Sequence, residues 1–373
     1  MIHMFTKKIY EKRVNTLFSQ VEEDIDALIL SGTYNILYFT GFDGAIVTVL
    51  LREEKPIVIV PRLEYLRARD TIAYGDVIGI SPYEADLSSY EKIYTGKTWE
   101  LAKKILKEKG VDGKIGIDKA EFKVDSYNES LKILDSEFVD ITKTVAKLRS
   151  IKSEEEVKII RESINVAEKA MKKAIESLDK GITESEVAAE IDKVLRHNFS
   201  DRSFDPIVAF GANAAYPHAK PGHRELKNGD FVIIDLGARL AGYCSDITRT
   251  FIYGKPSEKQ KKIFNIVLKA QAEAIEYVKA GIEAKEVDKK AREILKNAGL
   301  SQYFNHGLGH GVGLEVHEIP YLNPTSKDIL LEGMIVTIEP GVYIDGFGGV
   351  RIEDMILVTK DGSEVLTKFE KNL

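Results

Sequence analysis

Hydrophobic and polar residues follow two different periodicities along this chain. In residues 8–145, short runs of aliphatic and β-branched residues alternate with segments whose apolar residues recur every three or four positions, which predicts an α/β unit. We expect strands at residues 26–30, 45–51, 56–60 and 114–118, and helices at residues 10–21 and 99–109. No residues of this half have the spacing of a catalytic site, so we expect it to shape a substrate site or a dimer contact.

From residue 148 onward, one order of elements occurs twice. Capping boxes, in which a Ser or Thr hydroxyl and a Glu or Gln three residues later satisfy free amides at a helix start, begin at Ser153, Thr183 and Ser257. We expect helices at residues 153–178, 183–198, 257–279 and 283–297. A histidine-containing loop and an acidic hairpin follow each helix pair, which predicts an α+β domain with internal duplication and pseudo-two-fold symmetry. The predicted domains are residues 1–147 and 148–373.

The first hairpin carries one aspartate in each strand. Its two runs of β-type residues are 231–238 and 243–252. If they fold symmetrically about residues 240–241, Asp235 lies opposite Asp246, on the same face and roughly 5 Å away. Two buried carboxylates so close together are destabilising unless a positive charge lies between them. A metal cation is the simplest candidate.

The second hairpin repeats this arrangement. Its first strand, in residues 332–341, aligns with the first strand of the earlier hairpin, with glycines matching at both ends, and Glu339 then takes the place of Asp235. Folding about Gly346 places Glu339 opposite Glu353. The two hairpins together therefore present four acidic side chains that need neutralising.

Five of the seven histidines lie between residues 218 and 317, in the same half as the four acids. His310 has glycine on both sides, a setting that suits a metal ligand. Four carboxylates and one imidazole form a mostly hard, oxygen-rich ligand set, which favours Mn or Co, leaves Fe and Zn possible, and excludes a thiolate-rich zinc site. Two divalent ions would balance four carboxylates and could share an activated water, which is the machinery of a hydrolase.

Single residues of this pattern also have ordinary structural explanations. A lone aspartate in a strand is more often a turn or edge residue. We interpret His3 and His197 as surface or satisfied core residues, and His223 as a loop residue. His306 either packs or supports the ligands, and Cys244 is best explained as a small buried hydrophobic residue. Packing alone does not explain the combination of these features, which are paired acids, duplicated units and a glycine-flanked histidine.

Composition limits the class of partner. The chain has 373 residues, a formal net charge of -6 and a pI near 5.8, which argue against a nucleic-acid partner. Its first residues lack the apolar core of a signal peptide, and no run of about 18 apolar residues could span a membrane. A single cysteine allows no internal disulfide, which predicts a cytoplasmic protein.

The acidic motifs resemble those of the pita-bread metallopeptidases, which include prolidase, aminopeptidase P and methionine aminopeptidase. The resemblance rests on Asp235 in Ile-Asp-Leu-Gly, Asp246 in Ser-Asp-Ile-Thr-Arg-Thr, His310 in Gly-His-Gly-Val-Gly, Glu339 in Ile-Glu-Pro-Gly and Glu353 in Val-Arg-Ile-Glu-Asp. Residues 34–42 resemble the creatinase-type N-terminal domain, which methionine aminopeptidases lack. The resemblance thus implies a creatinase-type α/β domain, a pita-bread catalytic domain and the Xaa-Pro peptidase branch.

The resemblance also implies a role for each ligand. Asp246 and Glu353 would bridge two metal ions, Asp235 would bind one ion, and His310 and Glu339 would bind the other. Glu339 would in addition act as the general base that relays a proton from the bridging water to the departing proline nitrogen.

Four further residues would assist these ligands. His218 and His317 match the two histidines that hydrogen-bond the scissile carbonyl in this family. Arg351, with Thr248, is expected to fix the orientation of the carboxylate ligands. A homodimer is expected as well.

Two departures from the family pattern affect the substrate prediction. Tyr321 follows His-Glu-Ile-Pro at a position where prolidases often have an arginine for the free carboxylate of a dipeptide, and Leu308 replaces a small polar residue. Chain length nevertheless favours hydrolysis of Xaa-Pro dipeptides. The alternatives are an aminopeptidase P acting on longer peptides, a hydrolase of non-peptide amides, and a pita-bread binding protein without catalysis.

Overall fold

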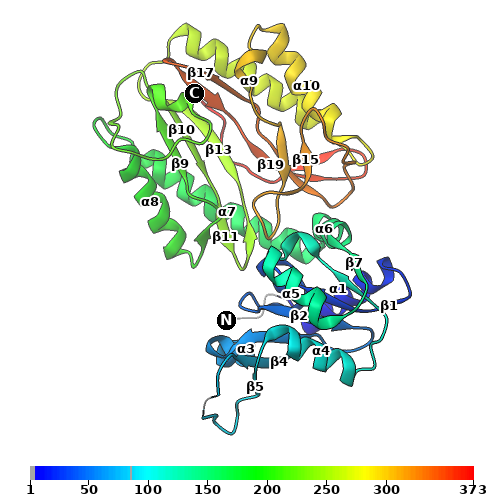
Figure 1. The fold of residues 1–373 in the computed structure, drawn as a ribbon. Helices are drawn as coiled ribbons and strands as arrows, with labels where there is room; N and C mark the ends of the chain where they lie inside the picture. Colours follow the sequence, from blue (N-terminus) through cyan, green and yellow to red (C-terminus); the bar gives the residue numbers. More distant parts are fainter. Residues whose placement is uncertain (1–4, 85) are drawn as a thin grey trace. The chain divides into compact units, whose positions relative to one another are not determined.

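The computed structural model describes residues 5–84 and 86–373, so His3 lies outside the described residues. The chain forms two compact units, which meet in the sequence between Arg149 and Ser150. Figure 1 shows their helices and strands. Among the described helices, none is both long and apolar enough to cross a lipid bilayer.

The first unit is built on a mixed seven-stranded sheet with the order β5-β4-β3-β2-β1-β6-β7. Strand β2 is antiparallel to β1 and β3, and the other neighbouring strands are parallel. The strands are β1 Ile25–Leu30, β2 Val47–Leu51, β3 Ile57–Pro61, β4 Asp76–Ser81, β5 Ile93–Thr95, β6 Lys114–Ile117 and β7 Phe138–Asp140. The helices are α1 Lys7–Gln20, α2 Thr33–Thr40, α3 Tyr65–Thr71, α4 Thr98–Glu108, α5 Val124–Leu134 and α6 Thr142–Ser150, with short 3-10 helices η1 Arg62–Glu64 and η2 Lys119–Glu121.

The predicted α/β unit is confirmed. All four expected strands and both expected helices lie within three residues of their predicted ends. The sheet is buried because its central strands are apolar, and Ile29, Val49 and Ile59 are fully inaccessible to solvent in a core shared with Trp99 of α4.

A buried aspartate connects β6 to the start of α2. Asp118 accepts hydrogen bonds from the Ser31 amide and from the Asn35 side-chain amide, both at 2.9 Å. Burial raises the pKa of Asp118 to about 8, although these two bonds oppose the shift. Helix α2 ends at Gly41, whose left-handed φ of 74° suits a glycine cap.

The second unit contains two pairs of helices and two groups of strands. The helices are α7 Glu154–Glu176, α8 Glu184–His197, α9 Glu258–Tyr277 and α10 Ala284–Asn297, with 3-10 helices η3 Gly211–Ala215 and η4 Ser301–Tyr303. The first group of strands is β8 Asp201–Arg202, β9 Ile207–Phe210, β10 Phe231–Leu236, β11 Ala238–Leu240, β12 Tyr243–Cys244 and β13 Ile247–Ile252. The second group is β14 Gly309–Gly311, β15 Glu318–Leu322, β16 Ile335–Ile338, β17 Gly341–Ile344, β18 Gly348–Arg351, β19 Asp354–Val358 and β20 Ser363–Val365.

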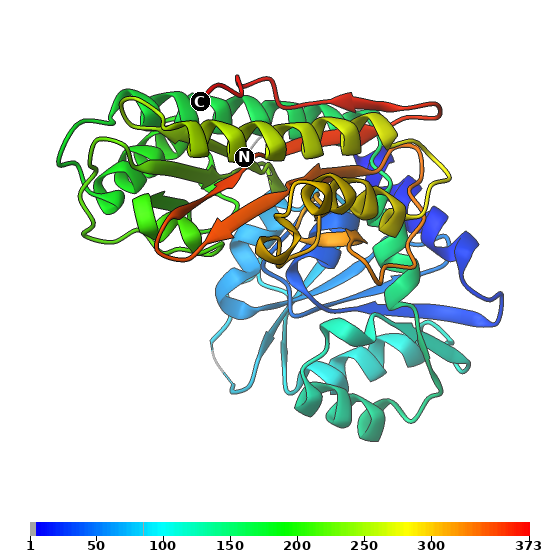
Figure 2. The ribbon, with the colours of Figure 1, turned by 90° about the horizontal axis from the view of Figure 1, so that it is seen from above.

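The predicted duplication is visible in this order. All three capping boxes form, since the hydroxyls of Ser153, Thr183 and Ser257 each accept from the amide three residues later. Figures 1 and 2 show that α7 and α8 lie beside β9 and β10. They also show α9 and α10 beside the second group of strands. Each half therefore buries the apolar face of one helix pair against its own strands.

The register of the first hairpin differs from the prediction. Asp235 pairs with Thr248 and not with Asp246. The reason is the turn, which consists of Ala241 and Gly242, both with positive φ (52° and 90°), as a two-residue hairpin turn requires. Alanine rarely adopts this conformation, so the sequence did not indicate the turn. Asp246 consequently lies diagonally across from Asp235, two residues before its partner.

The register of the second hairpin is the predicted one. Strands β16 and β19 pair Ile338 with Asp354, and the same register continues between β17 and β18 around Gly346. Glu339 therefore lies opposite Glu353 at the break between the two strand pairs.

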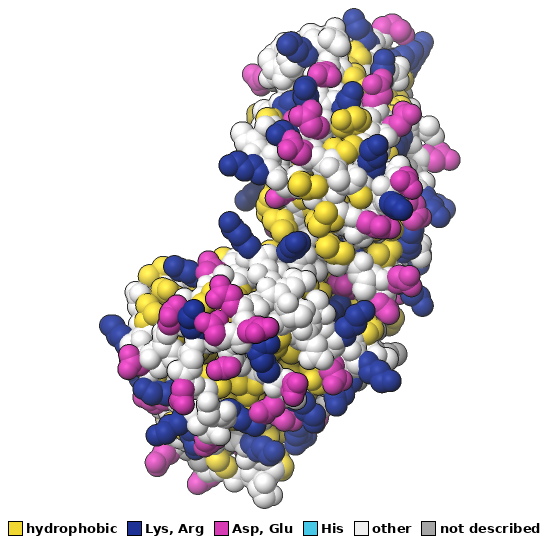
Figure 3. All heavy atoms as spheres, turned by 90° about the vertical axis from the view of Figure 1, so that its right-hand side faces the viewer, with side chains coloured by type: hydrophobic (Ala, Val, Ile, Leu, Met, Phe, Trp, Pro, Cys, Tyr) yellow, Lys and Arg dark blue, Asp and Glu magenta, His cyan; other side chains and the backbone are white. Residues whose placement is uncertain are grey.

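Charged side chains are mixed over the surface. On the face drawn in Figure 3, acidic and basic side chains of the described residues are interspersed, and the basic ones form no continuous patch. On this face, therefore, the described charges form no basic patch of the kind that binds nucleic acid.

Candidate metal centre

Ligand atoms from both hairpins converge in the second unit. One ligand atom each of Asp246, His310 and Glu353 lie within 4.8 Å of one another. His310 Nε2 is 3.8 Å from Asp246 Oδ2 and 3.2 Å from Glu339 Oε1. Asp235 belongs to the same cluster, because its charge and that of Asp246 influence each other. The structure thus brings together all five residues that the sequence analysis named as ligands.

The glycines around His310 allow this convergence. A Cβ atom at Gly309 would lie 2.0 Å from the carbonyl oxygen of Thr337, so β14 can approach β16 only with glycine there. The His310 amide donates to Thr337 Oγ1 at 3.1 Å, and its ring Nδ1 lies 3.2 Å from the carbonyl of Gly311. The ring is therefore oriented with Nε2 toward the acids.

The chain compensates the acidic cluster only in part, because burial raises the pKa of Asp235 by more than the charge of Arg351 lowers it. Asp235, Asp246 and Glu353 are buried, and Glu339 is partly exposed. Burial raises the pKa of Asp235, Asp246 and Glu353, and the neighbouring carboxylates raise all three further. Burial also raises the pKa of Glu339, but its hydrogen bond and charge interaction with His310 outweigh that effect and lower the value to about 2.

Two observations indicate that a cation fits between these groups. Asp235 Oδ1 is buried and has no hydrogen-bond partner among the residues that the structure describes, which leaves a strong acceptor unsatisfied. The donor set is four carboxylates and one imidazole, with no thiolate, and this is a chemistry that suits divalent Mn, Co, Fe or Zn. The side chains present therefore fit a metal centre.

Arg351 and Thr248 contact the acids as expected. Arg351 Nη2 donates to Asp235 Oδ2 at 2.6 Å, and its Nε donates to Thr248 Oγ1 at 3.2 Å. Thr248 Oγ1 in turn donates to Glu353 Oε2 at 2.7 Å. One arginine therefore connects a carboxylate of the first hairpin with a carboxylate of the second.

Tyr343 is a site residue that the sequence analysis missed. Its hydroxyl lies 2.9 Å from Arg351 Nη1 and 2.9 Å from His306 Nε2. His306, left open between packing and support, thus supports the site through this tyrosine. Burial raises the pKa of Tyr343 to about 12. The only signal in the sequence was its place in the strand after Glu339, within an apolar run that looks like ordinary core.

His218 and His317, the histidines predicted to contact the substrate, both line one cavity of about 560 Å3. All five predicted ligands line the same cavity. The ring centres of His317 and His310 are 4.2 Å apart. Desolvation, followed by the charge of His310, lowers the pKa of His317 to about 4, so this imidazole is neutral at neutral pH. His218 is exposed, in the loop after η3. The cavity has the size of a site for a small peptide.

The remaining predictions for single residues concern groups away from this cavity. His197 and His223 are exposed, so His197, for which the sequence allowed either the surface or the core, lies at the surface. Cys244 is fully buried, and burial raises the pKa of its thiol to about 11, which agrees with a packing role.

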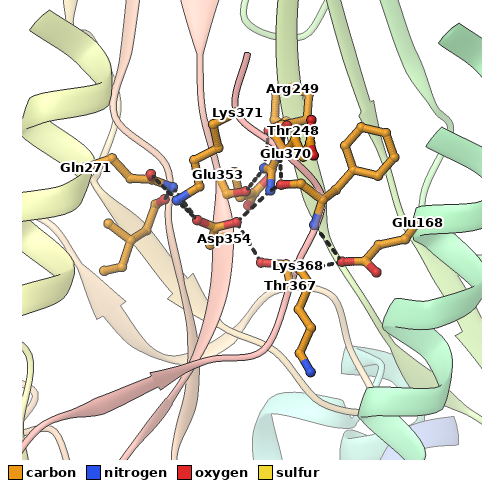
Figure 4. A network of polar contacts seen from close by, with 12 residues as sticks. Glu168, Thr248, Arg249, Gln271, Glu353, Asp354, Thr367, Lys368, Glu370 and Lys371 are labelled. Carbon is orange, nitrogen blue, oxygen red and sulfur yellow. Dashed lines mark hydrogen bonds and ion pairs between the residues drawn. The ribbon is translucent and has the colours of Figure 1, made fainter. Parts of the chain in front are cut away.

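A second polar network lies beside the candidate metal ligands, and Figure 4 shows it next to Thr248 and Glu353. Because side chains alternate along a strand, Arg249 and Asp354 point away from the face that carries Thr248 and Glu353. Arg249 Nη2 donates to Asp354 Oδ1 at 2.8 Å and to the carbonyl of Phe369 at 2.7 Å. The ion pair of Arg249 and Asp354 thus connects β13 of the first hairpin with β19 of the second, on the strand faces opposite those of Thr248 and Glu353.

The segment 367–371 completes that network. Asp354 accepts hydrogen bonds from Thr367 Oγ1 at 2.7 Å and from Gln271 Nε2 at 3.0 Å, and it forms an ion pair with Lys371. Glu168 of α7 accepts from the amides of residues 368 and 369 (Figure 4). The segment therefore links both helix pairs to the strands that carry the acids.

Comparison with known families places the chain in a class. Residues 158–360 match the model of metallopeptidase family M24, and residues 18–151 match the Creatinase/Prolidase N-terminal domain. The first match covers more than half of the chain, and so the chain belongs to metallopeptidase family M24.

Its relatives include named peptidases. The chain is 39% identical over 370 residues to the Xaa-Pro dipeptidase of Pyrococcus horikoshii, covering 98% of this chain and 99% of the relative. It is 38% identical over 356 residues to the Xaa-Pro dipeptidase of Pyrococcus furiosus, covering 94% and 96%.

Solved structures of both peptidase types are similar to it. An Xaa-Pro dipeptidase from Bacillus anthracis superimposes with a TM-score of 0.88 at 35% identity, covering 98% of this chain and 99% of that one. An X-Pro aminopeptidase from Thermotoga maritima superimposes with a TM-score of 0.84 at 29% identity, covering 93% and 97%.

Proposed function

We propose that this protein is a dinuclear metallopeptidase that hydrolyses Xaa-Pro dipeptides at the bond before proline. The observation that carries the proposal is the convergence of four carboxylates and His310 on one cavity, with Asp235 Oδ1 buried and without a hydrogen-bond partner in the described chain. Two relatives of nearly the same length, each more than a third identical, are named Xaa-Pro dipeptidases, which supports the substrate class.

Five residues would hold two divalent ions. Asp246 and Glu353 would be the shared ligands, Asp235 would serve one ion, and His310 and Glu339 would serve the other. Mn and Co suit this oxygen-rich set best, with Fe and Zn as alternatives. When bound, such ions lower the pKa of a water and polarise a carbonyl oxygen.

The residues of the chain supply proton transfer and orientation. Glu339, ionised at neutral pH because its pKa is low, accepts a proton at its carboxylate and returns it to the proline nitrogen. His317 is neutral and can donate its ring N–H to the carbonyl oxygen, and His218 approaches from the opposite loop. Arg351 and Thr248 keep the carboxylates in position.

Aminopeptidase P activity on longer peptides is the second candidate. The observation that favours it is Tyr321, which lies on the cavity wall where an arginine could bind a free carboxylate. A chain with a single cysteine suits the reducing cytoplasm, where we propose that the protein acts as a homodimer.

The test compares Ala-Pro with Ala-Pro-Ala, using protein loaded with Mn or Co and Glu339→Gln as the inactive control. We expect hydrolysis of the dipeptide and strong preference for it. Cleavage of the tripeptide alone would identify an aminopeptidase P. Cleavage of neither substrate by metal-loaded protein would refute the proposed substrate class.

A further inference from the structure

One positive charge on the cavity wall has no partner. Arg351 and Lys220 are the two lysine or arginine side chains that line the cavity. Arg351 is buried and uses its guanidinium for Asp235, Thr248 and Tyr343. Lys220 is exposed and forms no hydrogen bond or ion pair with any residue that the structure describes. Its ammonium group is therefore available to a ligand.

The backbone that carries Lys220 is held in place. All residues of the loop 217–221 line the cavity, and a proline at each end restricts the backbone. The carbonyl of its first residue accepts a hydrogen bond from Arg351 at 3.2 Å. Directly after the loop, the amide of Gly222 donates at 3.0 Å to Glu184, a buried carboxylate. The loop therefore fixes where the flexible lysine side chain begins.

Charge in the cavity is distributed unevenly. The floor carries the four acids of the metal centre, and Asp205 on the wall is paired with Arg202 at 3.0 Å. A dipeptide carries an amine at one end and a carboxylate at the other. In the metal-loaded protein two divalent ions would balance the four acids, so the exposed ammonium of Lys220 is the lysine or arginine charge left for the carboxylate end of the dipeptide. Tyr321 is 43% exposed, and its phenol carries no positive charge in either protonation state.

We propose that Lys220 binds the free carboxylate of the dipeptide and so selects dipeptides over longer Xaa-Pro peptides. The inference rests on the proposed function and names the residue that decides its substrate length. A longer peptide presents an uncharged amide at this position and gains nothing from the ammonium group. Lys220, in the loop 217–221, thus supplies the charge that Tyr321, in strand β15, does not.

The experiment compares Ala-Pro with its amide, Ala-Pro-NH2, which differ in one charge. We expect the metal-loaded wild-type protein to prefer the acid, and Lys220→Met to reduce the ratio of kcat/KM for acid over amide roughly ten-fold, mainly through KM for Ala-Pro. Lys220→Arg should restore most of the preference. Lys227→Met changes an exposed lysine that does not line the cavity and is the matched control.

The outcomes separate this inference from the function on which it rests. If the wild type prefers the acid and Lys220→Met keeps that preference, Lys220 is not the carboxylate site and the dipeptidase stands. Equal hydrolysis of acid and amide by the wild type would also overturn the role of Lys220. If loaded wild-type protein hydrolyses neither compound, the proposed function fails and the inference with it. Because the contact is exposed, the wild-type preference should also weaken at high salt.

Discussion

Replacing Arg249 by methionine tests whether the network beside the candidate ligands stabilises the second unit. Arg249 is 1% exposed and donates to Asp354 at 2.8 Å and to the carbonyls of Thr248 and Phe369 at 2.9 and 2.7 Å. Methionine fills a similar length but donates no hydrogen bond. The substitution therefore leaves buried acceptors on two strands and on the segment 367–371 without this donor.

The magnitude follows from these contacts. Removing one partner of a buried ion pair costs about 3 to 5 kcal/mol, because the other charge stays buried. Asp354 keeps its bonds from Thr367 and Gln271, so we expect the lower end, about 3 kcal/mol. For a unit of this size each kcal/mol lowers the unfolding midpoint by about 2 to 4 °C, which predicts a decrease of about 6 to 12 °C.

The assay is thermal unfolding of the metal-free protein, followed by circular dichroism. Arg161→Met is the control, because Arg161 also forms an ion pair, with Glu364 at 2.7 Å, but both side chains are at least 36% exposed. An exposed pair contributes about 1 kcal/mol or less, so its loss should lower the midpoint by less than about 4 °C. Equal decreases for the two variants would refute the reasoning.

Three other perturbations have defined outcomes. His317→Ala should lower kcat roughly 100-fold with little change in metal content measured by mass spectrometry, because we propose that the ring, which lines the cavity, hydrogen-bonds the scissile carbonyl and is not a ligand. Removing metal with a chelator should lower the unfolding midpoint, measured by scanning calorimetry, because the buried carboxylates then repel one another. Asp118 has a folded-state pKa of about 8 against an ordinary 3.8, so folding favours its protonated form and the unfolding free energy in urea should fall from pH 4 to pH 8, but less in Asp118→Asn.

Local patterns predicted a large part of the fold. The capping boxes marked three helix starts because both capping partners lie within one helical turn. Over so short a distance, the spacing of two residues in the sequence determines whether they can contact each other. The acids were visible because a charge in an apolar strand needs an explanation. Ala241 shows the limit, since the turn that fixed the register of the first hairpin depends on a backbone conformation that alanine seldom adopts.

Contacts between distant residues were not predictable in the same way. Arg249 and Asp354 are 105 residues apart, and each looks in the sequence like a polar residue on an exposed strand face. Tyr343 looks like core until Arg351 and His306 are placed beside it. Such contacts form only when the two hairpins pack against each other. The residue pattern of a single strand does not encode that packing.

The proposed ligand set is divided between the two repeats of the second unit. Asp235 and Asp246 come from the first repeat, whereas His310, Glu339 and Glu353 come from the second. During synthesis, a growing chain that has passed residue 300 therefore contains two of the five groups and cannot yet form the centre. Metal acquisition has to wait until the last strands emerge and dock, so a nascent chain cannot cleave peptides before its fold is assembled.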